Sequence, residues 1–362
     1  MGIKKRVLFF GPFTGPVTGQ SISFRQSYLN FQDDKILFNT NPFNKLKFLN
    51  SLYCLLILPS FFFIFNFEKV YFTSTRSNLG FIKDFQLLLL SRIFKKKIIN
   101  HLHGSDFMDF YLNSKFLKKV IFWSYSQIDV SIVLLPSMIA QYSDFRNMKV
   151  VVISNCYSSE YLNSKVYLGQ KKREVIFLSN LIYSKGIFIF LSAAKEILKQ
   201  DKTVVVKIAG LPMGDSFMSE KKVKYKFQKI SKILKEDFPN RFFYLGSVKG
   251  KNKEELLKNS SIFVLPTFYK TEAFPISIVE AMYFGNVIIA TNHNYLKDII
   301  GKENGFLINP KSVNNLVNQT LFLLRNKNLC RKFQKHNHTV AKEKYNPNAY
   351  NSNLKRVIVN LK

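Results

Sequence analysis

Two glutamates in the stretch TEAFPISIVEAM have the type and spacing that point most directly to chemistry. Seven residues separate Glu272 from Glu280, and a helical pattern begins between them near Ile276. The first backbone amides of a helix have no partner inside it and carry the positive end of the helix dipole, so a phosphate is their natural ligand. Helical side chains lean toward the N-terminus, which turns Glu280 toward that phosphate.

The two carboxylates suit sugar hydroxyls rather than phosphate, because a carboxylate accepts hydrogen bonds and a diol donates them. Glu280 is therefore expected to hold a ribose, and Glu272 a second sugar just before the helix. A diphosphate between two sugars is a nucleotide-sugar. The alternative reading is a solvated Glu272 and a Glu280 on an ordinary helix surface.

The surrounding pattern predicts the elements that position these groups. A strand over 261–266 precedes the loop with Glu272, and Gly285 and a strand over 287–290 follow the helix. This order places both glutamates at the carboxyl edge of a parallel sheet, where open α/β sheets bind ligands.

The same alternation of strands and helices covers most of the chain and predicts an α/β protein with parallel sheets. A polar stretch over 158–173 separates two such sets and is the expected interdomain linker. Residues 313–362 read as helices. The predicted strands before the linker are 6–10, 69–73, 97–101, 130–135 and 149–153, with helices at 21–30, 79–94 and 116–126; after it come strands 174–178 and 203–209 around a helix at 186–199.

The Glu272–Glu280 stretch, Gly285 and the following VIIAT run resemble the signature of family 4 glycosyltransferases, of the group 1 type. The resemblance implies the GT-B fold, in which two Rossmann-like domains with parallel sheets face a central cleft. Residues 1–165 would bind the acceptor, residues 166–345 the nucleotide-sugar, and residues 346–362 would form a helix that crosses back to the first domain.

The resemblance also implies an activity. It is a retaining, metal-independent transfer from a nucleotide-diphosphate sugar, with a UDP-sugar as the expected donor. The expected acceptor is a lipid-linked saccharide of bacterial surface polysaccharide synthesis, such as O-antigen, capsule or lipopolysaccharide. No cofactor or metal is expected, since no Asp-x-Asp motif lies in a suitable loop.

Further donor-binding positions follow from the resemblance. Lys185, which precedes a predicted helix, would reach the diphosphate as a mobile positive charge. The family has an arginine five positions earlier, where this chain has Asn180, so one expected cation is missing. Gly210 and Val248 follow two predicted strands on the donor side. Around Glu272, the donor-binding positions are Ala273, Phe274 and Ile276; Pro275 lacks an N–H and removes one donor to the ligand.

Two positions in the first half also belong to the predicted site. Gly15 lies in the loop over 11–19, whose glycines are four apart and so do not form a dinucleotide fingerprint. His103 follows a predicted strand and is expected to be catalytic, near the donor sugar. His101 is either a core histidine or a second cleft residue, and Asp106 is a weaker candidate for orienting substrate.

The composition limits which kinds of partner the protein is expected to bind. With 54 basic and 23 acidic residues, the net charge of +31 predicts an anionic partner, namely a membrane surface, an acidic ligand or nucleic acid. No RNA-binding motif accompanies the charge, so nucleic acid is the weakest of these. The three cysteines are scattered and form neither a metal spacing nor an even disulfide set, as expected for the reducing cytoplasm.

A long apolar run over 52–67, interrupted by Pro59, allows two interpretations. It is either a buried helix with its connection, the favoured reading, or an interfacial segment of a peripheral membrane protein at the inner face of the membrane. Two other functions remain open at this stage. One is a nucleotide-sugar epimerase, and the other is a non-catalytic GT-B binding subunit, which the missing cation at Asn180 supports.

Overall fold

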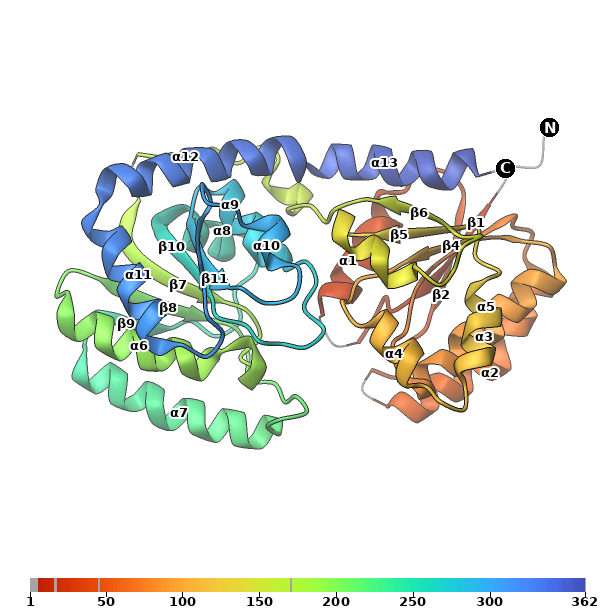
Figure 1. The fold of residues 1–362 in the computed structure, drawn as a ribbon, viewed down its shortest axis with the longest axis horizontal. Helices are drawn as coiled ribbons and strands as arrows, with labels where there is room; N and C mark the ends of the chain where they lie inside the picture. Colours follow the sequence, from red (N-terminus) through yellow and green to blue (C-terminus); the bar gives the residue numbers. More distant parts are fainter. Residues whose placement is uncertain (1–5, 16–17, 45, 170, 362) are drawn as a thin grey trace. The chain divides into compact units, whose positions relative to one another are not determined.

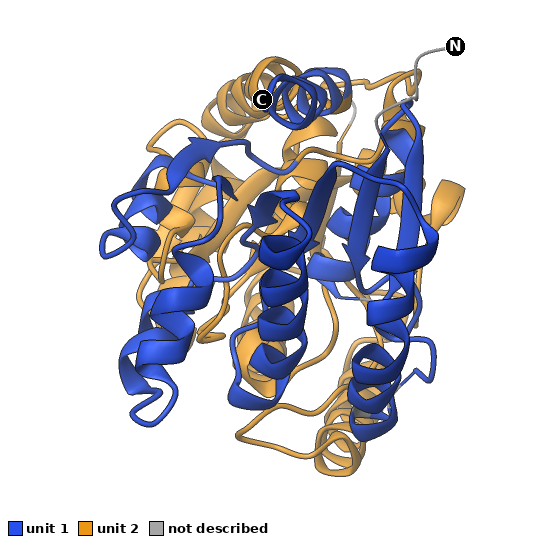
Figure 2. Ribbon diagram, turned by 90° about the vertical axis from the view of Figure 1, so that its right-hand side faces the viewer, with its two compact units in different colours: residues 1–155, 348–362 blue, residues 156–347 orange. Residues whose placement is uncertain are grey.

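The computed structural model describes residues 6–15, 18–44, 46–169 and 171–361. It divides the chain into two compact units, unit 1 (Met1–Asn155 with Asn348–Lys362) and unit 2 (Cys156–Pro347) (Figure 2). The division precedes the expected linker at 158–173. In that stretch Tyr161 is buried, and its ring packs edge-on against Phe284 at 4.9 Å, so the stretch is part of unit 2.

Unit 1 is built on a six-stranded sheet in which all neighbouring strands are parallel (Figure 1). Its strands in spatial order are β2 (Lys35–Asn39), β1 (Val7–Gly11), β3 (Lys69–Thr73), β4 (Lys97–His101), β5 (Val130–Val133) and β6 (Lys149–Val152). Its helices are α1 (Gly19–Asn30), α2 (Lys47–Ile64), α3 (Asn78–Ile93), α4 (Phe107–Asn113), α5 (Lys118–Tyr125), the 3-10 helix η1 (Pro136–Tyr142) and α13 (Pro347–Asn360).

The central strands of unit 1 are buried along their whole length. Every residue of β1 and of β3 is buried, as continuous apolar strands are when helices cover both faces of a parallel sheet. The last helix, α13, packs on this unit, because Lys69 of β3 donates hydrogen bonds to the carbonyls of Ile358 and Val359 at 2.7 Å each.

Helix α2 corrects the favoured reading of the apolar run. The run is helical as far as Ile64, with Pro59 inside the helix, and Cys54, Leu58 and Phe62 lie on its buried side. Its other side is open: Leu56, Phe63 and Ile64 are exposed by 67–77%. Both sides of the run are apolar, so its composition could not reveal that only one of them is covered. No helix within the described residues is long and apolar enough to cross a membrane.

Unit 2 has a second six-stranded sheet, again with parallel neighbours. Its strands in spatial order are β12 (Gly305–Ile308), β11 (Val287–Thr291), β10 (Ser260–Leu265), β7 (Lys172–Leu178), β8 (Val205–Ala209) and β9 (Phe242–Tyr244). Its helices are η2 (Ser159–Tyr161), η3 (Tyr183–Lys185), α6 (Ile187–Gln200), α7 (Glu220–Asp237), α8 (Gly250–Asn259), α9 (Ile276–Tyr283), α10 (Leu296–Ile299), α11 (Val313–Arg325) and α12 (Lys327–Lys344). The prediction of an α/β protein with two parallel sheets is confirmed.

Candidate functional site

The glutamate motif lies at the carboxyl edge of the sheet of unit 2. Strand β10 leads into the loop with Glu272, which is followed by α9 and β11, in the predicted order. The Glu272 side chain is buried, and its Oε2 accepts a hydrogen bond from the Thr267 hydroxyl at 3.3 Å and contacts the ammonium of Lys185. The structure therefore brings together two predicted site residues that are far apart in sequence.

Lys185 is held in place by its own loop. The preceding amide, that of Ser184, donates to Asp215 Oδ2 at 2.9 Å. Gly186 has a φ of +82°, and a Cβ there would lie 2.1 Å from the Pro266 carbonyl oxygen. Burial by itself would raise the pKa of Asp215, but hydrogen bonds from the loop amides outweigh it and lower that pKa. Only glycine therefore fits beside Lys185, and the ionised Asp215 fixes the turn.

Glu280 lies in α9, is 3% exposed, and forms an ion pair with Lys253 at 2.6 Å. Lys253 belongs to α8 and was not among the predicted site residues. Nothing in the sequence distinguishes it from its neighbours Lys251 and Lys258. Burial, with a contribution from the Glu280 carboxylate, raises the pKa of Cys156 to about 12, so this thiol stays protonated at neutral pH.

The start of α9 is open to a ligand. Its N-cap residue is Pro275, and no side chain caps the helix, so the first amides depend on another partner. Ala273 and Phe274, predicted to touch the donor, are both buried. The ring of Phe274 packs edge-on against Tyr345 at 5.4 Å, so this side chain holds the loop in place.

The other predicted donor residues follow neighbouring strands at the same edge. Asn180 comes after β7, and its carbonyl accepts from Ile182 at 2.9 Å. Gly210 comes after β8 with a φ of +144°, and a Cβ there would lie 1.8 Å from the Ser179 carbonyl oxygen. Its amide donates to Gly246 at 2.7 Å, which joins it to the segment that ends in the partly exposed Val248.

In unit 1, His103 lies just past the carboxyl end of β4. Both of its ring nitrogens are closed off from solvent and have no hydrogen-bond partner among the described residues. Burial, then the neighbouring His101 and Arg76, hold the pKa of His103 well below its usual range, so the ring is neutral. His101 is a core residue: it is fully buried, and its Nδ1 lies 2.6 Å from the hydroxyl of Tyr71.

Two further predicted positions of unit 1 have clear surroundings. Asp106 forms an ion pair with Arg76 at 2.5 Å, so its carboxylate already has a cation. Gly15 has a φ of +99°, and the loop before it is tied to Asn39, whose Oδ1 accepts from the amides of Phe13 and Thr14. Residues 16 and 17 of this loop lie outside the described residues.

A polar pocket of about 270 Å³ lies in unit 1, at the carboxyl ends of β1, β2 and β3, and was not predicted from the sequence. Hydroxyl and amide side chains such as Thr18, Thr40 and Asn41 line it, together with Lys83 and Asp84. Asp84 is fully buried on α3. Its Oδ2 accepts from the Thr75 amide at 2.8 Å, while its Oδ1 has no partner within the described part of the chain. Burial raises the pKa of Asp84 to about 6.

Among the residues that the structure describes, no group of three or more His, Cys, Asp or Glu is placed to hold a metal ion. The charges and hydrogen-bonding groups of the site determine the chemistry open to it. In unit 2 these are two buried carboxylates, each paired with a lysine, beside an uncapped helix start.

Comparisons with known proteins find glycosyltransferases. Residues 161–339 match the family glycosyl transferases group 1. The chain is 23% identical over 281 residues to the 2-deoxystreptamine N-acetyl-D-glucosaminyltransferase of Niallia circulans, covering 72% of this chain and 68% of that protein. It is 29% identical over 156 residues to an uncharacterized glycosyltransferase of Methanocaldococcus jannaschii, covering 42% of this chain and 36% of that protein.

Solved structures share the fold over nearly the whole chain. The Anabaena protein Alr3699/HepE, in complex with UDP and glucose, superposes with a TM-score of 0.72 at 16% identity, over 99% of this chain and 100% of that one. Sucrose-phosphate synthase from Thermosynechococcus elongatus has a TM-score of 0.72 at 13% identity, over 99% of each chain. These likenesses confirm the predicted GT-B fold.

Proposed function

From the match of residues 161–339 to the glycosyl transferases group 1, we propose which reaction the protein catalyses. It moves a sugar from a nucleotide-diphosphate sugar, with UDP as the nucleotide, to a lipid-linked saccharide, and the anomeric configuration is retained. The observation that carries this proposal is the pair of buried carboxylates, Glu272 and Glu280, on either side of the uncapped start of α9. A similar structure, that of HepE, holds UDP and glucose, which supports the choice of donor.

Each group at the edge of unit 2 has a role in this proposal. The amides at the start of α9 bind the diphosphate, and Lys185 neutralises the charge that grows on it as the sugar leaves. Glu280 accepts hydrogen bonds from the ribose hydroxyls, with Lys253 fixing its carboxylate. Glu272 accepts from the hydroxyls of the donor sugar. These groups are already ordered, so little reorganisation accompanies the reaction.

The transfer needs no nucleophile from the enzyme. The acceptor oxygen forms its bond to the anomeric carbon on the face from which the bond to the diphosphate oxygen breaks, so configuration is retained. The acceptor proton passes to the departing phosphate. His103 remains the predicted catalytic residue of unit 1, and its ring is neutral, with no hydrogen-bond partner among the described residues.

Unit 1 has features that suit the acceptor. The polar pocket beside β1–β3 is lined by hydroxyl and amide groups and by Lys83 and Asp84. Such a lining complements sugar hydroxyls. We assign this pocket to the saccharide part of the acceptor.

The open side of α2 supports a lipid-linked acceptor and a peripheral position at the inner face of the membrane. Leu56 and Phe63 are 67% and 77% exposed, and the chain carries a net charge of +31. Placing such a side chain in an apolar phase gains about 1.5–3 kcal/mol. Leu56→Ser with Phe63→Ser should therefore weaken binding to anionic liposomes at least tenfold in sedimentation, while Leu29→Ser, at another exposed apolar position, should not. Equal binding by all three proteins would contradict the membrane part of the proposal.

The donor site is tested by thermal stabilisation without metal. A ligand that binds the folded state raises the melting temperature, so one nucleotide-sugar of a panel should stabilise the protein more than its matched nucleotide. Glu280→Gln should abolish the shift, and Glu236→Gln, at an exposed position of α7, should preserve it. If no nucleotide-sugar stabilises the wild-type protein, or if Glu280→Gln keeps the full shift, the proposed donor site is wrong.

Asn180 motivates a second candidate, a GT-B binding subunit without activity of its own, because the family's arginine is absent there. A nucleotide-sugar epimerase is the other enzymatic alternative. Incubation with the stabilising nucleotide-sugar, with and without lipid-linked saccharide, separates the three. A transferase forms nucleotide and a longer saccharide only with acceptor, an epimerase converts the donor alone, and a binding subunit does neither.

A further inference from the structure

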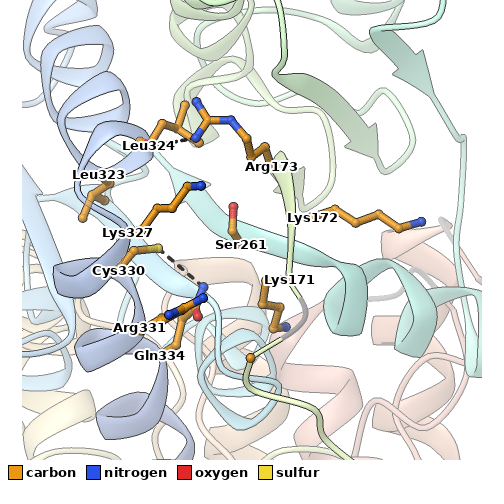
Figure 3. A pocket seen from close by; sticks show the side chains of 11 residues that line it. Lys171, Lys172, Arg173, Ser261, Leu323, Leu324, Lys327, Cys330, Arg331 and Gln334 are labelled. Atoms are coloured by element: carbon orange, nitrogen blue, oxygen red, sulfur yellow. Dashed lines mark hydrogen bonds between the residues drawn. The ribbon is translucent and has the colours of Figure 1, made fainter.

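Unit 2 has a second pocket, of about 230 Å³, at the amino ends of its strands (Figure 3). It lies beside the starts of β7 and β10, where Lys172 is paired with Ser260, and against the first turns of α12. The donor residues described above follow the carboxyl ends of the same strands. In a parallel sheet these are opposite edges, so this pocket is separate from the donor site.

The charged residues that line this pocket are all basic. Arg173 is already used, because it pairs with Asp201 at 2.5 Å and donates to the Leu324 carbonyl at 2.6 Å. The side chain of Lys172 points away from the other cations in Figure 3. The positive charges left for a ligand are therefore those of Lys171, Lys327 and Arg331.

Helix α12 supplies one wall through a single face. Lys327, Cys330, Arg331 and Gln334 follow one another at helical spacing, and Figure 3 shows the Lys327 ammonium reaching into the space beside Ser261. Lys327 is the first residue of this 18-residue helix, whose first turn has no acidic residue and no side-chain cap. Positive side chains at the positive end of a helix repel the helix dipole. A bound anion would remove this repulsion.

Lys171 closes the pocket on the side of the sheet. Its ammonium donates to the Leu257 carbonyl at 2.8 Å, and an ammonium carries three donors. Burial lowers the pKa of Lys171 to about 7, and an anion beside it would favour its charged form. The serine hydroxyl of Ser261 and the amide of Gln334 add neutral hydrogen-bonding groups to the lining.

We propose that this pocket binds the phosphate groups of a small polyanion, at a second site distinct from the donor site. Three cations in one recess, without a lining carboxylate, match the charge of a diphosphate better than that of a monoanion. The volume is small for a complete nucleotide-sugar, since pockets for ligands of that size span about 300–1,000 Å³. The phosphate can belong to a free ion or to a lipid headgroup, and the same side chains would hold either. This inference does not depend on the proposed transfer reaction.

Calorimetric titration of the full chain with inorganic pyrophosphate tests the site. Lys327→Met with Arg331→Met should weaken binding at least tenfold. The control, Lys332→Met with Lys335→Met, removes the same charge from the same helix at positions that do not line the pocket, and should bind like the wild type. Melting temperatures of both double variants without ligand show whether they are folded.

Two further measurements identify the source of the phosphate and exclude binding of pyrophosphate at the donor site as the explanation. Binding to phosphatidylcholine vesicles with and without phosphatidate tests whether the phosphate belongs to a lipid headgroup. If no protein binds pyrophosphate, but the pocket variant loses the phosphatidate-dependent binding of the wild type, the site exists and its ligand is a lipid. Binding of pyrophosphate that disappears in Lys185→Met but survives in the pocket variant belongs to the donor site and overturns the proposal. So does a pocket variant that equals its control with both ligands.

Discussion

The carboxyl group of Asp84 should make the stability of unit 1 depend on pH in a way that Asp84→Asn removes. Burial raises the pKa of Asp84 from its ordinary 3.8 to about 6, against the hydrogen bonds from Thr75 and Tyr125. The folded protein therefore keeps this proton to a higher pH than the unfolded chain does. The stabilisation that the protonated group contributes is complete below pH ~4 and is lost as the pH rises to about 6.

The size of the effect follows from the two pKa values. One pKa unit corresponds to about 1.4 kcal/mol, so a rise from 3.8 to about 6 amounts to about 3 kcal/mol. Asparagine has no charge to bury at any pH. Its amide replaces an oxygen that lacks a partner among the described residues, which costs about 1–3 kcal/mol at every pH. The change with pH, rather than the constant offset, is the prediction.

Urea unfolding followed by tryptophan fluorescence measures this change. The single tryptophan of the chain, Trp123, lies on α5 of unit 1, with its ring 6.3 Å from that of Phe85, and therefore reports on this unit. Between pH 4.5 and 7.5, the free energy of unfolding of Asp84→Asn should rise relative to the wild type by about 2 kcal/mol. Asp33→Asn, at an exposed carboxylate, should run parallel to the wild type. A difference between Asp84→Asn and the wild type that stays constant over this range would refute the reasoning.

Three more predictions concern unit 2. Lys185→Met should destabilise it by about 3 kcal/mol, because a buried carboxylate loses its cation, and adding Glu272→Gln should restore most of that loss in urea unfolding; a double variant no more stable than the single one would contradict the pairing. Gly186→Ala should lower the melting temperature by several degrees in a thermal scan, since its Cβ would meet a backbone oxygen at 2.1 Å. Lys253→Met should weaken nucleotide-sugar binding about tenfold by calorimetry, because Glu280 loses the partner that orients it; unchanged affinity would remove Lys253 from the site.

Buried strands were the most predictable elements of this protein. The bounds of β3 and β4 agree with the predicted ones, because a strand covered on both faces is a short apolar run between polar ends. Strand β2 escaped prediction, since only one of its five residues is buried and its sequence lacks that contrast. Helix α2 was assigned to the core on its apolar composition, which is the same on its covered and its open side.

The amino-acid sequence by itself determined the local part of the site: a strand, a loop with Glu272, a helix that starts at Ile276, and Glu280 within its second turn. Helix starts, strand ends and the direction of nearby side chains depend on neighbouring residues, so their spacing is readable in the chain.

Only the tertiary structure decided which cations meet these carboxylates. Lys185 reaches Glu272 because it follows β7, and β7 and β10 are neighbours in the sheet. Lys253 reaches Glu280 from α8, a different helix, although its sequence surroundings resemble those of other lysines. The pocket at Asp84 is likewise lined by residues at the ends of three strands and by residues of α1 and α3. Strand order and helix packing arise from burial of the whole apolar surface, and no local pattern of residues encodes them.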